Sequence, residues 1–91
     1  MPDIVVEVNC PNDLVRDVDL KRDEWLRAGA KEVWVVSPDA QAVQVFRAGG
    51  APRFLREHDT LTSPELLPGF AVPVADLFRL PAPQAPAAAG E

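Results

Sequence analysis

The stretch PDIVVEVNCP, residues 2–11, decides how the rest of the sequence is read. Residues 3–8 are almost entirely apolar and β-branched, which is typical of a strand that is covered on both faces. Two acids interrupt this pattern, Asp3 and Glu7. Because side chains alternate along a strand, both acids share one face with Val5, and the opposite face is wholly apolar. The sequence therefore predicts a core strand that carries two carboxylates on one side.

The residues after this strand predict a helix. Cys10-Pro11 breaks the strand, and Asn12 or Asp13 is suited to cap the helix that follows. Apolar residues then recur at roughly helical spacing over residues 13–29. Gly29 is a natural stop. Within this helix, Val18, Trp25 and Leu26 are expected to face the sheet.

A second apolar strand, EVWVVS at residues 32–37, follows the helix closely. Strand, helix and strand within about 35 residues form a βαβ unit, so the two strands should be parallel. The unit predicts an α/β (α+β) fold. The crossover in such units is right-handed, which brings the helix back along the sheet with its first turns nearest Glu7.

The remaining chain predicts an antiparallel meander and a short C-terminal helix. The expected elements are strands at 42–48 and 53–58, a core-covering loop at 61–70, a helix at 73–80 and a Pro/Ala-rich tail at 81–91. The tail has nothing to bury and is expected to be disordered. We therefore expect one domain over residues 1–80 and a tail over residues 81–91.

Composition excludes several classes of protein. The chain has 91 residues, which suits one small domain, and a formal net charge of -5, which opposes strong non-specific binding to nucleic acid. Its single cysteine permits no internal disulfide. No apolar run approaches 18 residues and no secretory signal opens the chain, so we expect no membrane span and a cytoplasmic location.

The two strand acids cannot share one small cation. At roughly 3.3 Å per residue, Asp3 and Glu7 lie about 13 Å apart, whereas metal–oxygen ligand distances are roughly 2.1–2.5 Å. Asp3 is also readily explained as an exposed acid at the start of a strand. Glu7 lies near the carboxyl end of the strand, where α/β sheets place their sites. Two interpretations of Glu7 stay open: a structural ion pair or a catalytic carboxylate.

Lys21 is the expected partner of Glu7. A lysine on the sheet-facing side of the helix could hold a carboxylate and stabilise developing phosphate charge. The expected separation of the Lys21 amine and the Glu7 carboxylate is roughly 4–8 Å. The alternative is a surface Lys21 that pairs with Asp17, one helical step away.

Other candidate motifs indicate structure more than chemistry. Nothing in the sequence brings Cys10 and His58 together, and one residue of each type makes no zinc site. Gly49-Gly50 is typical of a hairpin turn. Trp25 and Trp34 are expected to be core anchors. Basic and acidic residues interleave along the helix, which favours a solvated, salt-bridged face.

Four blocks of the sequence together resemble a known family. They are PDIVVEVNCP, Lys21-Arg22 with Trp25 four residues after Lys21, AGAKEVWVVSP and LTSPELLPGFAVPVADLF. In order and spacing they are similar to the C-terminal half of the Uma-two family of endonucleases, a branch of the PD-(D/E)XK restriction-endonuclease-like superfamily. The resemblance covers residues 2–80.

This resemblance implies a magnesium-dependent phosphodiesterase core that acts on nucleic acid, with DNA as the candidate partner. Glu7 matches the strand glutamate of the family, and Asp3 matches the aspartate before it, so both are candidate metal ligands. Lys21 matches a catalytic lysine that has moved to the helix. Asn9 occupies the position where the superfamily usually has lysine. By the distance argument, the principal metal aspartate should come from a neighbouring strand upstream.

The resemblance also implies a truncated restriction-endonuclease-like core, since the family's N-terminal half has no counterpart here. We expect little nuclease activity from this chain, and either self-association or a missing N-terminal half, because strand 3–8 would leave an edge or face uncovered. The alternatives are a catalytically incompetent remnant and an unrelated small α/β interaction module.

Overall fold

The computed structural model describes residues 1–10 and 12–79. In chain order its elements are β1 (Ile4–Val8), α1 (Val15–Arg27), β2 (Glu32–Ser37), β3 (Ala42–Arg47), β4 (Arg53–Leu55), β5 (Thr60–Ser63), β6 (Leu67–Pro73) and α2 (Val74–Leu77). The tail predicted over residues 81–91 lies outside the described residues.

The main sheet has four strands in the order β1-β2-β3-β4. β1 and β2 are parallel, and β3 and β4 continue antiparallel. The predicted βαβ unit and meander are therefore confirmed. β4 ends at Leu55, so the strand expected over residues 53–58 is shorter than predicted. β1 stands at one edge of the sheet and β4 at the other.

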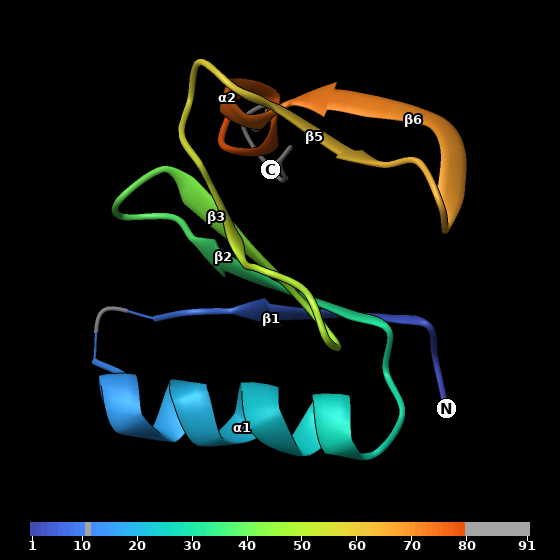
Figure 1. Cartoon of the computed structure of the whole chain (residues 1–91). Helices are drawn as coiled ribbons and strands as arrows, with labels where there is room; N and C mark the ends of the chain where they lie inside the picture. The colour runs from blue at the N-terminus through green and yellow to red at the C-terminus, as the bar shows by residue number, and fades with distance from the viewer. Residues whose placement is uncertain (11, 80–91) are drawn as a thin grey trace, which may run out of the picture.

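The sheet lies between two apolar layers, as Figure 1 shows with α1 on one face and the β5–β6 hairpin and α2 on the other. The layer beneath α1 contains buried Val5, Ala30, Val33 and Val35, packed against Val18, Trp25, Leu26 and Phe46. The predicted contact face of the helix is thus confirmed. The opposite layer is built from Trp34, Val43, Val45, Leu61 and Val74.

The segment 61–70, predicted as a loop, instead forms most of the β5–β6 hairpin. Thr60 pairs with Pro73 and Thr62 with Ala71, and the register shifts between Thr62 and Ser63. Proline is tolerated here because β6 pairs on one side only within the described chain. The expected cover of the core is confirmed for Leu61 and Phe70, and the Phe70 ring lies 5.9 Å from the Trp34 ring, centroid to centroid.

The ends of α1 differ partly from expectation. The Asp13 carboxylate accepts a hydrogen bond from the Cys10 backbone N–H at 2.8 Å, and Leu14 at the N-cap makes no side-chain cap. The predicted capping by Asn12 or Asp13 is therefore wrong, since Asp13 closes the preceding turn instead. Gly29 follows the helix with φ of 115°, in the region that favours glycine, so the predicted stop is confirmed.

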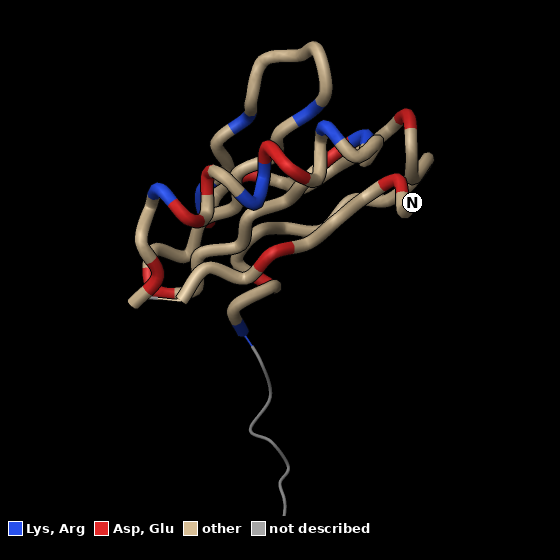
Figure 2. The backbone as a smooth tube through the Cα atoms, turned by 90° about the horizontal axis from the view of Figure 1, so that it is seen from below, with Lys and Arg blue, Asp and Glu red and all other residues tan. Residues whose placement is uncertain are grey.

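Charges of both signs alternate along α1, as Figure 2 shows. Arg22 contacts Asp19 and Asp23 at 3.2 Å each, and its guanidinium lies 4.3 Å from the centroid of the Phe46 ring. The salt-bridged helix face expected from the sequence is confirmed. No helix in the described part of the chain is long and apolar enough to cross a membrane.

Candidate active site

A pocket of about 340 Å³ lies at the carboxyl end of β1, between that strand and the first half of α1. Its polar lining comes from Glu7, Asn9, Asn12, Asp13, Asp17 and Lys21. The position is the one where parallel α/β sheets place their sites, because the strand ends and the following loop open there. The pocket thus gathers Glu7 and Lys21 from separate elements.

Glu7 points toward α1 and is fixed there by a tryptophan. The Trp25 indole Nε1–H donates a hydrogen bond to Glu7 Oε2 at 2.8 Å. The other carboxylate oxygen, Oε1, lies 4.0 Å from the Lys21 amine. The Glu7 side chain is 26% exposed and lines the pocket, with one oxygen bonded to Trp25 and the other beside the Lys21 amine.

Lys21 lies on the Glu7 side of the helix, at the short end of the separation expected from the sequence. Its side chain is 67% exposed, and at 4.0 Å its contact with Glu7 is a loose ion pair. The alternative partner, Asp17, makes no salt bridge with Lys21 in the described structure. An ion pair so exposed contributes little to stability, which leaves the amine available to another anion.

Asn9 adds an unpaired acceptor to the same pocket. It follows Glu7 by two residues, and its Oδ1 atom is buried yet accepts no hydrogen bond from the described residues. A buried carbonyl oxygen without a partner costs about 1–3 kcal/mol, so such atoms usually have a ligand or water. Asn9, which directly follows β1, is therefore a second oxygen ligand candidate in the pocket that Glu7 lines.

Asp3 does not join this group. It lies at the amino end of β1, where its carboxylate pairs with Lys31 at 3.7 Å and both side chains are 65% exposed. Its backbone carbonyl accepts hydrogen bonds from the Lys31 and Glu32 backbone N–H groups. The structure thus keeps Asp3 and Glu7 at opposite ends of the strand, as their spacing predicts.

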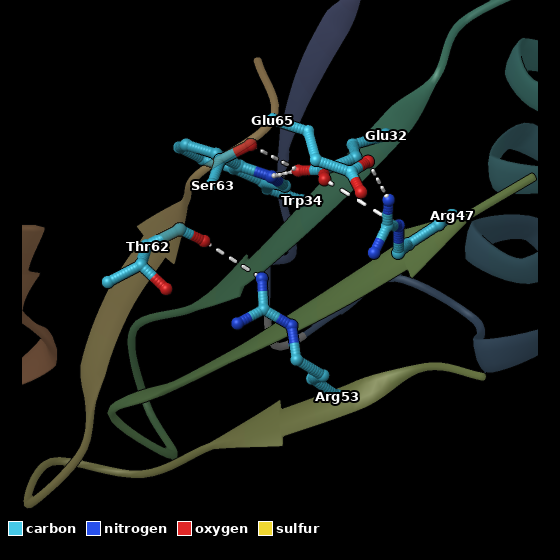
Figure 3. A network of polar contacts seen from close by, with 7 residues as sticks. All are labelled: Glu32, Trp34, Arg47, Arg53, Thr62, Ser63 and Glu65. Atoms are coloured by element: carbon cyan, nitrogen blue, oxygen red, sulfur yellow. Dashed lines mark hydrogen bonds and ion pairs between the residues drawn. The ribbon is translucent and has the colours of Figure 1, made fainter. Parts of the chain in front are cut away.

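A second glutamate–tryptophan pair lies at the amino end of β2, shown in Figure 3. Glu32 Oε1 accepts hydrogen bonds from Trp34 Nε1 at 2.9 Å and from Ser63 Oγ at 3.1 Å. Glu32 Oε2 lies 3.8 Å from Arg47 Nε, and Arg47 also pairs with Glu65. This network ties the β5–β6 hairpin to the sheet, and its carboxylate is almost fully buried.

The described residues hold no group of three or more His, Cys, Asp or Glu side chains that could enclose a metal ion. Among the pocket's carboxylates, Glu7 accepts a hydrogen bond from the Trp25 side chain and Asp13 accepts one from the Cys10 backbone. The described side chains at the site thus include an oriented carboxylate, a buried amide oxygen without a described donor and an exposed amine.

The sequence model of the Uma2 family, described as "Putative restriction endonuclease", matches residues 1–75. This chain belongs to the Uma2 family. The match includes β1, α1 and β2, and with them Glu7 and Lys21. No curated protein sequence matches the chain.

A solved structure has the same fold as this chain. It is described as "a putative nuclease belonging to DUF820" from Anabaena variabilis ATCC 29413, and it superposes with a TM-score of 0.73 at 22% sequence identity. The match covers 84% of this chain and 43% of that protein. The Uma2 chain therefore shares the fold over most of its length and spans less than half of the neighbour.

Sequence patterns did not predict the polar contacts of two residues, Trp25 and Glu32. Trp25 was expected only as a core anchor, although its spacing of four residues from Lys21 places both on one helix face. Glu32 was not singled out at all. The signal was present, since an antiparallel hairpin between 32–37 and 42–47 pairs Glu32 with Arg47.

Proposed function

We propose that this Uma2 chain forms one part of a magnesium-dependent nuclease site, with Glu7 as a metal ligand and Lys21 as the residue that binds phosphate. The supporting observation is the oriented Glu7 carboxylate beside the Lys21 amine in a pocket at the carboxyl end of β1. Family membership favours phosphodiester hydrolysis of nucleic acid as the reaction.

The donor chemistry of the pocket suits magnesium in kind. Mg²⁺ prefers oxygen ligands and is commonly held by one or two carboxylates, with waters and substrate phosphate in its other positions. Glu7 Oε1 and the unpaired Asn9 Oδ1 are such donors. When bound, the ion would polarise a phosphoryl oxygen and lower the pKa of a water molecule. Asp3 is too far along the strand to bind the same ion as Glu7.

The chain's own residues have separate tasks in this proposal. The Trp25 N–H orients Glu7 and leaves Oε1 directed into the pocket. The Lys21 amine, 4.0 Å from Glu7 Oε1, offers a positive charge to the substrate phosphate. The negative charge on this phosphate increases during hydrolysis, so the amine would stabilise it. Its exposed, loosely paired amine can leave Glu7 for an incoming phosphate without a large loss of stability.

One copy of the described structure supplies too few carboxylates for strong metal binding. We therefore propose that further ligands come from another polypeptide segment, and that an isolated copy cleaves nucleic acid weakly or not at all. The net charge of -5 is consistent with this view, because the chain has no large excess of positive charge to hold DNA or RNA.

Manganese binding followed by electron paramagnetic resonance tests the proposal, with Mn²⁺ as the probe for Mg²⁺. We expect weak binding by the 91-residue chain and loss of that binding in Glu7→Gln, which keeps the shape of the side chain and removes its charge. The matched control is Glu65→Gln, an exposed glutamate at the hairpin. Equal Mn²⁺ binding by wild type and Glu7→Gln would show that Glu7 is not a metal ligand.

Cleavage assays give a second readout. Plasmid DNA and single-stranded RNA are incubated with Mg²⁺ or Mn²⁺ and the dilute wild-type chain, and we expect little product. Robust cleavage that disappears in Glu7→Ala would show that one copy is a complete enzyme.

The alternative function is an interaction module, which the exposed Val6 and Val8 on β1 favour. This alternative predicts partner binding that is insensitive to Glu7→Gln.

A further inference from the structure

The outer edge of β1 has a set of backbone groups that no described strand satisfies. Toward β2, the Asp3 carbonyl accepts from Glu32 N–H and the Asn9 N–H donates to the Val36 carbonyl. In a parallel ladder the residues that bond to the neighbour alternate along the strand. Odd-numbered residues of β1 therefore bond to β2, and Ile4, Val6 and Val8 direct their N–H and C=O groups outward.

The same edge exposes apolar side chains. Val6 is 54% and Val8 58% exposed, although both belong to a strand with the composition of a sheet interior. Natural sheets usually protect an edge with charges, proline or a bulge. The outward-bonding residues of β1, Ile4, Val6 and Val8, include no charge and no proline. Its edge is thus suited to pairing with another strand.

We infer that a second copy of this chain pairs with β1 in antiparallel fashion, with the two-fold axis at Val6. In that register Val6 faces Val6 of the second copy, and Ile4 faces Val8. All three are outward-bonding residues, so each pair exchanges two backbone hydrogen bonds, about six in total. Ile4, Val6 and Val8 of both copies also form one continuous apolar row on the hairpin side of the joined sheet.

Charge favours this register over the parallel one. With the axis at Val6, Asp3 faces Asn9 of the second copy and Glu7 faces Val5, so no two acids are directly opposite. A parallel, in-register pair would place Asp3 opposite Asp3 and Glu7 opposite Glu7. Like charges directly opposite one another are destabilising. The antiparallel arrangement is also closed by symmetry, so association stops at two copies.

The pairing would also bring the two Glu7 side chains together, and this consequence rests on the proposed function. In the antiparallel register they are diagonal neighbours on the α1 side of the joined sheet, roughly 7–8 Å apart. Long side chains reach across that distance. Two glutamates from two copies would then supply the carboxylates that one copy lacks.

Cation binding and dimer formation should therefore strengthen each other. Without a cation, the two Glu7 carboxylates repel one another across the dimer axis. A divalent cation between them removes that repulsion and binds the dimer better than the monomer. By linkage, the cation must then tighten dimer formation by the same factor as dimer formation tightens cation binding.

Sedimentation equilibrium of the 91-residue chain, with and without Mn²⁺, tests both parts. We expect a monomer–dimer equilibrium that Mn²⁺ shifts about tenfold toward the dimer. Val6→Lys places a charge at the two-fold axis and should weaken the dimer at least about tenfold. The matched control is Phe54→Lys on β4, an exposed apolar residue at the opposite edge of the sheet, which should leave the dimer unchanged.

Glu7→Gln separates dimer formation from the composite site. It should dimerise at least as well as wild type without Mn²⁺ and lose the response to Mn²⁺. A wild-type chain that stays monomeric at several hundred micromolar would overturn the inference, as would a dimer broken by Phe54→Lys and not by Val6→Lys. If Val6→Lys stays monomeric yet binds Mn²⁺ through Glu7 as well as wild type, the composite site fails while the proposed single-copy ligand survives.

Discussion

The two glutamate–tryptophan pairs lie at opposite ends of the parallel strands and differ in how completely their carboxylates are used. Glu32 is 4% exposed and receives hydrogen bonds from Trp34 and Ser63 as well as the charge of Arg47. Glu7 is 26% exposed, receives one hydrogen bond from Trp25 and has a loose ion pair with Lys21.

The difference teaches how the same two residue types divide between stability and chemistry. A buried carboxylate must have its lone pairs satisfied, because an unpaired buried charge is costly. Glu32 meets this requirement and has nothing left for a ligand. Glu7 is oriented by one bond and retains an oxygen that faces the pocket, so it can accept a cation. Mutation of Glu32 should therefore lower the free energy of unfolding, whereas mutation of Glu7 should mainly abolish cation binding.

The largest effect on folding is expected for Glu32→Ala. The change leaves the Trp34 indole and Ser63 hydroxyl without their acceptor and Arg47 without its buried partner, at a cost of about 3 kcal/mol. Urea unfolding monitored by tryptophan fluorescence, at a concentration below that of self-association, measures the loss. A change below about 1 kcal/mol would show that the network does not stabilise the hairpin on the sheet.

A smaller effect is expected for Ser63→Ala. The Ser63 hydroxyl is fully buried and donates one of the hydrogen bonds to Glu32, which keeps its contacts with Trp34 and Arg47 after the change. The free energy of unfolding should fall by about 1 kcal/mol. The same urea titration measures it, with Ser37→Ala as the control in the main sheet. Equal effects at both serines would mean that the bond to Glu32 contributes nothing specific.

Glu7→Gln should change the stability of one copy still less, by about 0.5 kcal/mol. The glutamine carbonyl can still accept the hydrogen bond from Trp25, and the lost ion pair with Lys21 is exposed. Mn²⁺ binding should nevertheless disappear. A variant that loses stability as severely as Glu32→Ala would make Glu7 a structural residue and would contradict the contrast between the two ends.

The sequence predicted the Glu7 end well and the Glu32 end poorly, for physical reasons. Local periodicity and the right-handed crossover determine where α1 lies, so Lys21 could be placed near Glu7 within the expected separation. The family resemblance identified the same two residues. The burial of Glu32 depends on Ser63, 31 residues away on a hairpin that was predicted as a loop. In this hairpin the alternation of apolar and polar residues that is typical of a strand is interrupted by a bulge and by prolines at 64, 68 and 73.

Asn9 shows a different limit. Its identity and its place two residues after Glu7 are evident from the sequence, yet an unpaired buried oxygen follows only from the coordinates of its neighbours. No pattern of residue types reveals which acceptor lacks a donor. The candidate site therefore combines a pair that the sequence predicts, Glu7 and Lys21, with an amide oxygen whose lack of a donor only the three-dimensional structure reveals.

The smallest effect on folding is expected for Lys21→Met, and it carries the sharpest information about the site. The exposed ion pair with Glu7 is worth about 0–0.5 kcal/mol, so the free energy of unfolding should hardly change.

The effect of Lys21→Met on cation binding should be larger and of opposite sign. The Lys21 amine lies 4.0 Å from Glu7 Oε1 and repels any divalent ion bound at that oxygen, so its removal should tighten Mn²⁺ binding by roughly threefold to tenfold. Any nucleic-acid cleavage should fall at the same time, because the phosphate loses its positive partner. Arg16→Met, a change of the same charge about one and a half turns earlier in α1, controls for the general loss of positive charge. If Lys21→Met and Arg16→Met alter Mn²⁺ binding equally, Lys21 acts only through the net charge of the helix, and its assignment to the Glu7 site is wrong.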